Sequence, residues 1–492
     1  MRISNWNSNR DMIDFQIVPA DFYLLLPEMV LSVGAMLLLF LELFLKGNKT
    51  VQQWTAFAIF VVALSLLLSQ ESDGATGFGI MMRSDLFGQF ISAVVLIGGG
   101  LTVLLGKEYL VSREWHRGEY YSLLLFASVG MLFMVRGLDL LVIFLGLELL
   151  SISLYILVGY FRDRLFSNEA ALKYLLLGAF ASGFLLYGIA YTYGSYGTTN
   201  LNEIRTMGSP ESMTFHWIGL SLILVGFSFK VALVPFHMWS PDVYQGAPTP
   251  VTGFMATTTK AAAFAAMLRI LFYGFPADIA EWTPLFWFLS AVTMTVGNVI
   301  ALQQSNLKRM LAYSAIAHAG YLMIGVTVGT ETGAAGMLFY LLGYLFMNIG
   351  AFAVVQYFEG KDETRLDFES YAGLAKKHPL ISLAMTLFMF ALAGFPLTVG
   401  FTGKFYIFTT AINQGFIWLI VIAVLNSLIS VYYYLRVVIY MYMKPLEEEI
   451  EFSPMELPTK VALTVCVYAV LHLGVLPGNF ITLAREAVSA IF

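Results

Sequence analysis

Two long apolar stretches of the sequence each carry a lysine near the middle. Lys230 lies in GLSLILVGFSFKVALVPFHMW, and Lys260 lies in TGFMATTTKAAAFAAM. A lysine at the centre of a membrane-spanning helix costs about 2.5–3.5 kcal/mol, so it persists where it faces a bundle interior or a wet cavity and has a partner. Because an amine in such a place can bind and release a proton, these residues predict a proton or cation path through a membrane.

One carboxylate is placed to partner these lysines. Glu148 lies ten residues from either edge of the apolar stretch LDLLVIFLGLELLSISLYILVGY. A carboxylate that is buried alone keeps its proton unless a cation lies nearby. The cations on the neighbouring stretches are Lys173 and Lys230, and we expect Glu148 and Lys230 to form an ion pair.

Further titratable groups lie inside apolar stretches. His237 follows Lys230, His318 is in the middle of NLKRMLAYSAIAHAGYLMIGV, and Lys404 lies in GFPLTVGFTGKFYIF. With almost no other buried acid, these groups suit proton binding. The candidate proton path comprises Glu148, Lys173, Lys230, Lys260, His318 and Lys404.

Each candidate also has a structural alternative. The Glu148–Lys230 pair could serve only to fix helix packing, and the small residues around Lys260 are also typical of tightly packed helices. His318 could be a hydrogen-bonded core histidine. Lys173 is about one turn inside its stretch, so its long side chain could reach the membrane interface.

Two prolines interrupt the elements that carry these lysines. Pro235 and Pro396 lie deep within apolar stretches, each within about two turns of a lysine. Proline removes a helical hydrogen bond, and in membrane proteins a broken helix is tolerated where the freed backbone lines a cavity. The stretch 379–412 is also too long for one straight helix. We therefore expect two broken helices, the seventh and the twelfth along the chain.

The composition requires a membrane. The 492 residues are 59% hydrophobic and 12% charged, with a mean hydropathy of +0.76, which is too apolar for a soluble protein. We expect an all-α polytopic membrane protein of about fourteen spans. They lie near 22–45, 51–69, 86–106, 120–136, 138–160, 169–194, 216–239, 250–274, 284–304, 308–328, 334–358, 379–412, 416–443 and 459–477.

Several kinds of site are not predicted for this sequence. Cys466 is the one cysteine, so disulfides, zinc sites and iron–sulfur clusters are not expected. The sequence has no P-loop, no dinucleotide fingerprint after a strand and no nucleic-acid-binding patch. We expect no cofactor in this chain, which leaves proton or cation movement as its chemistry.

Lysine and arginine separate the two sides of the membrane. The loops after odd-numbered spans and their flanking helix ends hold sixteen of these residues, among them Lys46, Arg113, Lys361 and Lys377, whereas seven, including Arg2, Arg10 and Arg485, lie on the other side. By the positive-inside rule the first side is cytoplasmic. An even number of spans then places both termini outside the cytoplasm.

The paired breaks suggest an internal repeat. Residues 1–119 would hold helices 1–3, 120–274 a first repeat of helices 4–8, 284–443 a second repeat of helices 9–13, and 444–492 helix 14 and a tail. Because each repeat has five helices, the second would be inverted relative to the first, an architecture that places ion sites on broken helices at mid-membrane. No residue-level self-alignment carries this inference.

Several long motifs resemble a known family. FSFKVALVPFHMWSPDVYQGAPTPVTGFMATTTKAAAF, with LGLELLSISLYILVGY before it and GFPLTVGFTGKFYIF after it, closely resembles the antiporter-like membrane subunits of respiratory complex I, over roughly 120–440. The resemblance implies fourteen helices with two inverted five-helix repeats. It also implies proton-path roles for the residues in GLELL, AALKYLL, FKVALVPFH, TTTKAAAF, AIAHAGY and FTGKF, which are Glu148, Lys173, Lys230, Lys260, His318 and Lys404. Within the family, one sister subunit has glutamate where this chain has Lys404. Another is longer and carries a lateral C-terminal helix, whereas this sequence ends at Phe492.

The resemblance implies a proton-translocating, non-redox subunit of an NADH:quinone oxidoreductase in the bacterial inner membrane. Its partners would be the other membrane subunits and the lipid bilayer, with FMN, iron–sulfur clusters and quinone in partner subunits. Two alternatives remain open, a cation/proton antiporter subunit of the same fold and a passive scaffold. The identity of the copurifying subunits would distinguish them.

Overall fold

The structure is a computed structural model that describes residues 18–44, 48–360, 365–445 and 454–492. Thirteen helices in this part of the chain are long and apolar enough to cross a membrane. They are α2 (Leu26–Phe44), α3 (Lys49–Ser69), α4 (Leu86–Ser112), α5 (Glu119–Arg136), α6 (Leu140–Val158), α7 (Leu165–Tyr196), α9 (Met213–Val231), the continuous helix Thr249–Gly274, α13 (Ile279–Ala301), α14 (Leu307–Thr327), α15 (Glu331–Phe358), α19 (Ile417–Met443) and α20 (Leu457–Val475). The all-α polytopic class is therefore confirmed.

The fourteenth expected span is the broken one. It consists of α17 (Pro379–Ala393) and α18 (Val399–Asn413), each too short to count alone. The remaining elements are short: α1 (Pro19–Leu24), α8 (Leu201–Met207), α10 (Trp239–Gly246), α16 (Leu374–Lys377), α21 (Gly478–Val488), two 3₁₀ turns (Pro276–Asp278 and Phe368–Tyr371) and an antiparallel hairpin of β1 (Asp73–Gly77) and β2 (Met82–Asp85).

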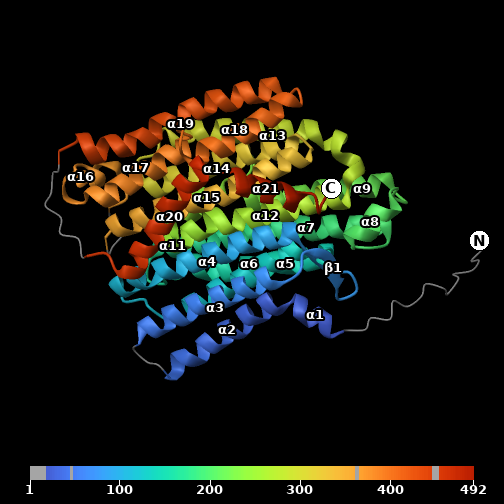
Figure 1. The fold of residues 1–492 in the computed structure, drawn as a ribbon, viewed down its shortest axis with the longest axis horizontal. Coiled ribbons are helices and arrows are strands. Elements are labelled where there is room, and N and C mark those ends of the chain that lie inside the picture. Colours follow the sequence, from blue (N-terminus) through green and yellow to red (C-terminus); the bar gives the residue numbers. More distant parts are fainter. Residues whose placement is uncertain (1–17, 45–47, 361–364, 446–453) are drawn as a thin grey trace, which may run out of the picture.

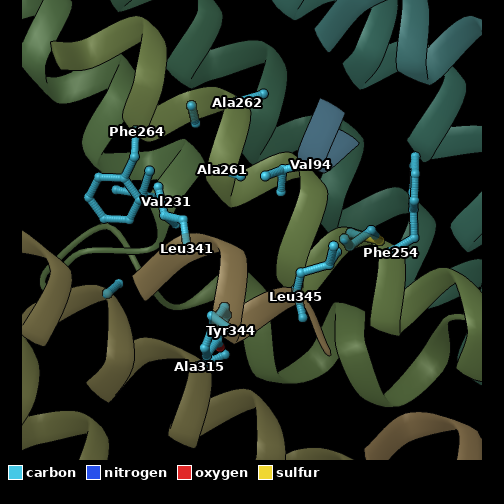
Figure 2. Packing of buried hydrophobic residues seen from close by; sticks show 14 of the residues in the cluster. Val94, Val231, Phe254, Ala261, Ala262, Phe264, Ala315, Leu341, Tyr344 and Leu345 are labelled. Atoms are coloured by element: carbon cyan, nitrogen blue, oxygen red, sulfur yellow. The ribbon is translucent and has the colours of Figure 1, made fainter. Parts of the chain in front are cut away.

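The helices run side by side, with α2 at one edge of the bundle and α19 at the other (Figure 1). Thr249–Gly274 and α15 are buried over their whole apolar windows, whereas α2, α3, α7 and α20 are buried over a third. Figure 2 shows Val94 of α4 beside Ala261 of the central helix, and Ala315 of α14 beside Tyr344 of α15. The helices that carry Lys260 and His318 are thus shielded by the others.

The first break follows Lys230 directly. Helix α9 ends at Val231, Ala232 adopts a left-handed φ of 60°, and the helix resumes only at Trp239. Pro235 therefore lies in a non-helical connection, because it cannot donate a backbone hydrogen bond. Groups freed by the break find partners: Val234 N donates to Thr293 Oγ1 at 3.1 Å, and Trp239 Nε1 donates to the Phe229 carbonyl at 2.9 Å.

The second break precedes Lys404. Helix α17 ends at Ala393 and is followed by Gly394, which has a φ of 92°. Glycine adopts this left-handed conformation without strain. A Cβ at Gly394 would also lie 3.2 Å from Cδ of Lys404. The turn therefore favours glycine, and a Cβ here would require the Lys404 side chain to shift by a few tenths of an ångström.

Local contacts recur at a constant spacing along the chain. Isolated β-bridges join Asp139 to Asn200 and Asn306 to Asp367, and each member of the second pair follows its counterpart by 167 residues. Asp139 caps the N-terminus of α6, and Asn306 caps that of α14. Helices α6 and α14 thus begin in the same way.

A close helix crossing recurs at the same spacing. A Cβ on Gly130 of α5 would meet the backbone of Gly146 and Leu150 within 2.6 Å. At Gly297 of α13, 167 residues later, it would meet the Ala317 nitrogen at 2.6 Å and the Tyr313 carbonyl at 3.0 Å. Glycine allows both helix pairs to approach closely.

The two ends of the bundle hold different loops. At the C-terminal end of α4, Arg113 pairs with Glu359 at the end of α15 at 2.8 Å, and Lys107 pairs with Glu456 at 2.9 Å. At the N-terminal end of α4, Arg269 pairs with Asp85 at 2.8 Å. Four residues used to assign the sides lie outside the described residues: Arg2, Arg10, Lys46 and Lys361.

Candidate proton path

Lys230 is held by hydroxyl groups. Its side chain is only 3% exposed, and its Nζ donates to Ser151 Oγ at 2.8 Å and to Tyr174 OH at 3.3 Å. Ser151 comes from α6 and Tyr174 from α7, so the lysine at the end of α9 joins three helices. An ammonium that is desolvated and faces hydroxyls alone is held less firmly than one facing a carboxylate.

Glu148 does not pair with Lys230 in this structure. Glu148 is half-buried and accepts a hydrogen bond from Ser182 Oγ of α7, and within the described residues no ion pair includes Glu148. The expected ion pair is thus replaced by hydroxyl contacts: Ser182 binds Glu148, whereas Ser151 and Tyr174 bind Lys230.

A small cavity lies beside Lys230 and the serine that binds Glu148. It has a volume of about 10 Å³ and is lined by Ser151, Tyr155, Gly178, Ser182 and Lys230, among others. This is the lower limit for one water molecule. Gly178 leaves room for the hydroxyl of Tyr155, which would lie 2.1 Å from an added Cβ. The cavity therefore adjoins both Lys230 and Ser182, the serine that binds Glu148.

Lys173 lies away from Glu148. Its side chain is 42% exposed and pairs with Asp242 at 2.7 Å and with Glu169 at 2.8 Å. Asp242 also pairs with Arg309 at 2.6 Å. Burial raises the pKa of Asp242, but the two cations outweigh burial and hold the pKa below its ordinary value. Lys173 thus belongs to a charged cluster where α7, α10 and α14 meet.

Lys260 lies at a change in helix geometry. The continuous helix consists of α11 (Thr249–Phe254), a π-helical segment (Met255–Thr259), α12 (Lys260–Leu268) and a second π-helical segment (Arg269–Gly274). Such wide turns often occur at functional sites. Lys260 is 1% exposed, and its Nζ donates to the carbonyl of Ala315 on α14. Among the described residues no carboxylate pairs with it.

His318 is enclosed by tyrosines. Its Nδ1 lies 2.6 Å from Tyr340 OH, and its Nε2 lies 3.1 Å from Tyr434 OH. The rings of Tyr321 and Tyr344 lie 5.7 and 5.1 Å away. Both ring nitrogens therefore have a partner that can donate or accept a proton.

Lys404 uses the backbone that the second break sets free. Its Nζ donates to the carbonyls of Leu392 at 3.2 Å and Ala393 at 3.1 Å and to Ser427 Oγ at 3.1 Å. It also lies over the ring of Tyr321, 4.7 Å from the centroid, a favourable position for a cation. These contacts replace a counter-ion.

One face of α14 connects these groups. Ala315, His318 and Tyr321 are spaced three residues apart and lie on the same side of a helix. Lys260 contacts Ala315, and Lys404 lies over Tyr321. His318 is therefore between the two lysines, which matches the order Lys260, His318, Lys404 in which these groups follow one another along the sequence.

Sequence reasoning missed the hydroxyl groups of the site. Ser151, Ser182, Tyr174, Tyr340 and Tyr434 contact the titratable residues directly. Serine and tyrosine are common in apolar stretches, so their types alone carry no strong signal. Only the fold brings them together.

Other buried hydroxyls lie nearby without a hydrogen bond to the protein. In the described part of the chain these are Thr259 Oγ1 beside Lys260, Tyr344 OH beside His318, and Tyr244 OH and Ser240 Oγ of α10. Buried polar atoms of this kind usually bind water. The region around Lys260, His318 and α10 is thus more polar than its sequence indicates.

The described residues offer no site for a metal. No three His, Cys, Asp or Glu residues among them lie close enough to hold an ion, and Cys466 is buried and unpaired.

Comparison with known proteins gives one consistent family. The family described as "NADH:quinone oxidoreductase/Mrp antiporter, TM" matches residues 137–430. NADH-quinone oxidoreductase subunit N from Trichlorobacter lovleyi is 49% identical over 471 residues, which cover 95% of this chain and 97% of the relative. Subunit N 1 from Solibacter usitatus is 42% identical over 95% of this chain and 97% of the relative.

Solved structures give the same fold. A chain of respiratory complex I from Thermus thermophilus, with bound aureothin, is 36% identical, with a TM-score of 0.80 over 94% of this chain and 100% of that one. A chain of the Mrp complex from Dietzia is 19% identical, with a TM-score of 0.83 over 96% of this chain and 97% of that one. The latter likeness is one of fold alone.

Proposed function

The chain belongs to the NADH:quinone oxidoreductase/Mrp antiporter family as a subunit N of bacterial NADH-quinone oxidoreductases, and we propose that its buried lysines carry protons across the membrane. In this proposal Lys230, Lys260, His318 and Lys404 form the path, and Glu148 controls the proton affinity of Lys230. Lys173 would act with Asp242 and Arg309 at one mouth of the path. The observation that carries the proposal is the single face of α14 that contacts Lys260, holds His318 and meets Lys404 through Tyr321.

The energy source would lie outside this chain. As a non-redox subunit of a translocase, it would bind no cofactor, while FMN, iron–sulfur clusters and quinone would be held by partner subunits. Conformational change driven by electron transfer there would alter the Glu148–Lys230 separation. The absence of cysteine clusters from the sequence supports this division of work.

The interaction energy of an ion pair is comparable to the cost of moving a proton across the membrane. Two unit charges 4 Å apart interact by about 4 kcal/mol at an effective dielectric constant of 20. Moving one proton against the membrane potential costs about 2.3 kcal/mol per 100 mV. Moving Glu148 away from Lys230 would thus lower the proton affinity of Lys230 by an amount comparable to this cost, which favours transfer of its proton towards Lys260, His318 and Lys404.

Inverted repeats would give the path its geometry. The β-bridges at Asp139 and Asn306 and the close crossings at Gly130 and Gly297 recur after 167 residues, which supports the boundaries 120–274 and 284–443. Residues 1–119 and 444–492 would then flank the repeats. The counterparts Asp139 and Asn306 begin helices separated by an odd number of spans, which supports inversion.

We further propose the location and partners of the chain. It would lie in the bacterial inner membrane beside other membrane subunits of complex I and lipid, with both termini outside the cytoplasm. The concentration of lysine and arginine in loops at one end supports this orientation.

The proposal is tested first at Glu148. Glu148→Ala removes the control of Lys230, so proton transport per NADH oxidised in reconstituted vesicles should fall by several-fold while the complex stays assembled. Glu148→Asp keeps the charge and should be milder. Normal pumping by Glu148→Ala would show that this carboxylate is structural.

A further inference from the structure

An apolar groove of about 790 Å³ runs between α17 and α20. Each helix contributes residues spaced three or four apart, which form one face of each helix. They are Leu380, Leu383, Ala384 and Leu387 of α17 and Leu463, Thr464, Val467 and Leu471 of α20. The groove therefore follows the helix axes, across what would be one leaflet of a membrane.

One end of this groove is basic. His378 and Lys460 line it, and Lys376 and Lys377 immediately precede His378 on α16. All three lysines are exposed. In Figure 1 both α17 and α20 begin at this end of the bundle, on the side of α16. The groove thus combines apolar walls with a positively charged mouth.

The charge of the mouth comes from its lysines. His378 packs edge-on against Tyr357 and Phe358. Burial and Lys377 hold the pKa of His378 below its ordinary value, which leaves it neutral at pH 7. The nearby carboxylate of Glu456 already pairs with Lys107 at 2.9 Å.

We propose that this groove binds a phospholipid with an anionic headgroup. Its acyl chains would lie along the apolar faces of α17 and α20, and its phosphate would contact Lys460 and the pair Lys376–Lys377. Basic pockets between membrane helices on the cytoplasmic side suit such headgroups. The site depends on the chain spanning a membrane and not on the proton path.

The dimensions of the groove favour acyl chains over a partner helix. A helix about 10 Å across occupies roughly 1,200 Å³ for each 15 Å of its length, which is more than the whole groove. A whole helix therefore cannot lie inside the groove. Narrow, flexible chains can fill it and satisfy its walls.

Labelling of the purified complex with a photoactivatable lipid tests the site. The probes are phosphatidylglycerol and phosphatidylethanolamine that carry the same reactive acyl chain. We expect phosphatidylglycerol to label the peptides of residues 380–387 and 463–471 several-fold more strongly. Replacing Lys376, Lys377 and Lys460 by glutamine should remove this preference, since each lysine near an anionic surface is worth about fivefold in binding.

Two further variants distinguish binding of the lipid headgroup from binding of the acyl chains. Thr464→Trp fills the groove and keeps all three lysines, and it should reduce labelling by both lipids. The Thr464 hydroxyl donates only to the Lys460 carbonyl of the same helix, so we expect the protein to tolerate the loss of this hydrogen bond. Arg162→Gln removes an exposed charge between α6 and α7, outside the residues that line the groove, and should leave labelling unchanged.

Three results would overturn the proposal. Equal labelling by the two lipids would mean that the groove holds bulk lipid, or that the acidic run 447–451, which lies outside the described residues, neutralises the lysines. Labelling of a partner subunit instead would mean that protein covers the groove. Unchanged labelling in Thr464→Trp would mean that the chains lie elsewhere.

Discussion

The buried lysines of this protein are bound by neutral partners. Lys230 donates to a serine and a tyrosine, Lys260 to a carbonyl, and Lys404 to two carbonyls and a serine. Neutral oxygens hold an ammonium without fixing its proton as a carboxylate does. Sequence reasoning identified which lysines are buried, but it could not identify these partners, because carbonyls and hydroxyls are present throughout the chain.

Ser182 stabilises Glu148 apart from Lys230. Ser182→Ala removes the hydroxyl that donates to the carboxylate, and a hydrogen bond to a charged group is worth about 1.5–3 kcal/mol. The Glu148 carboxylate should then pair with Lys230 and hold its proton more firmly. We expect proton pumping to fall several-fold with assembly intact. The measurement is proton uptake by vesicles at a fixed rate of NADH oxidation.

A matched serine gives the control for this substitution. Ser65 of α3 donates to the Val61 carbonyl of its own helix on an exposed face, so Ser65→Ala should pump normally. Ser182→Thr keeps the hydroxyl and should pump better than Ser182→Ala. Equal rates for Ser182→Ala and the unaltered protein would mean that this contact has no role.

The helix breaks beside the lysines could be predicted because they depend on residues close in sequence. Prolines and glycines predicted both broken helices, and the ends of α9 and α17 lie where those residues require. The π-helical segment before Lys260 was not predicted, because its sequence MATTT fits an ordinary helix equally well. The relation of Lys260 to His318 also depends on how α12 and α14 pack.

Gly394 tests the role of the second break. Gly394→Ala must adopt a φ of 92° and place a Cβ near Lys404, at a backbone cost of about 1–2 kcal/mol. We expect a lower melting temperature and impaired pumping, because Lys404 would lose its place beside the freed carbonyls. Both quantities are measured on the purified complex.

Gly183 is the matched control for this change. It lies within α7, and a Cβ there would meet nothing within 4 Å. Gly183→Ala should keep or slightly raise stability, since alanine favours helix. If the two alanine variants behaved alike, the break would not need its glycine.

At the scale of the whole molecule, the two proposed repeats meet where α10 and α11 pack against α14 and α15. The sequence predicted the number of spans, because apolar length is a direct signal of a membrane helix. It could not show the pairs of matching contacts that lie 167 residues apart, because these rest on Asp, Asn and Gly at capping and crossing positions. Such residues are too common for an alignment to find.

The orientation of the bundle follows from its basic loops. In a Cys466→Ser background, Lys376→Cys should react only with reagents that reach the cytoplasm, and Glu486→Cys only with reagents added outside. Both positions are exposed, so failure to label would not arise from burial. Labelling of Lys376→Cys from outside would reverse the proposed topology.

Lys404 gives the most direct test of the proton path, since it is the terminal group reached through Tyr321. Lys404→Arg keeps the positive charge, but an arginine with a pKa above about 12 cannot release a proton. The measurement is the number of protons moved per NADH oxidised, in assembled complexes reconstituted in vesicles. The proposed path predicts a marked loss in both Lys404→Arg and Lys404→Ala, whereas an arginine variant that pumps at the normal ratio would exclude Lys404 as a proton carrier.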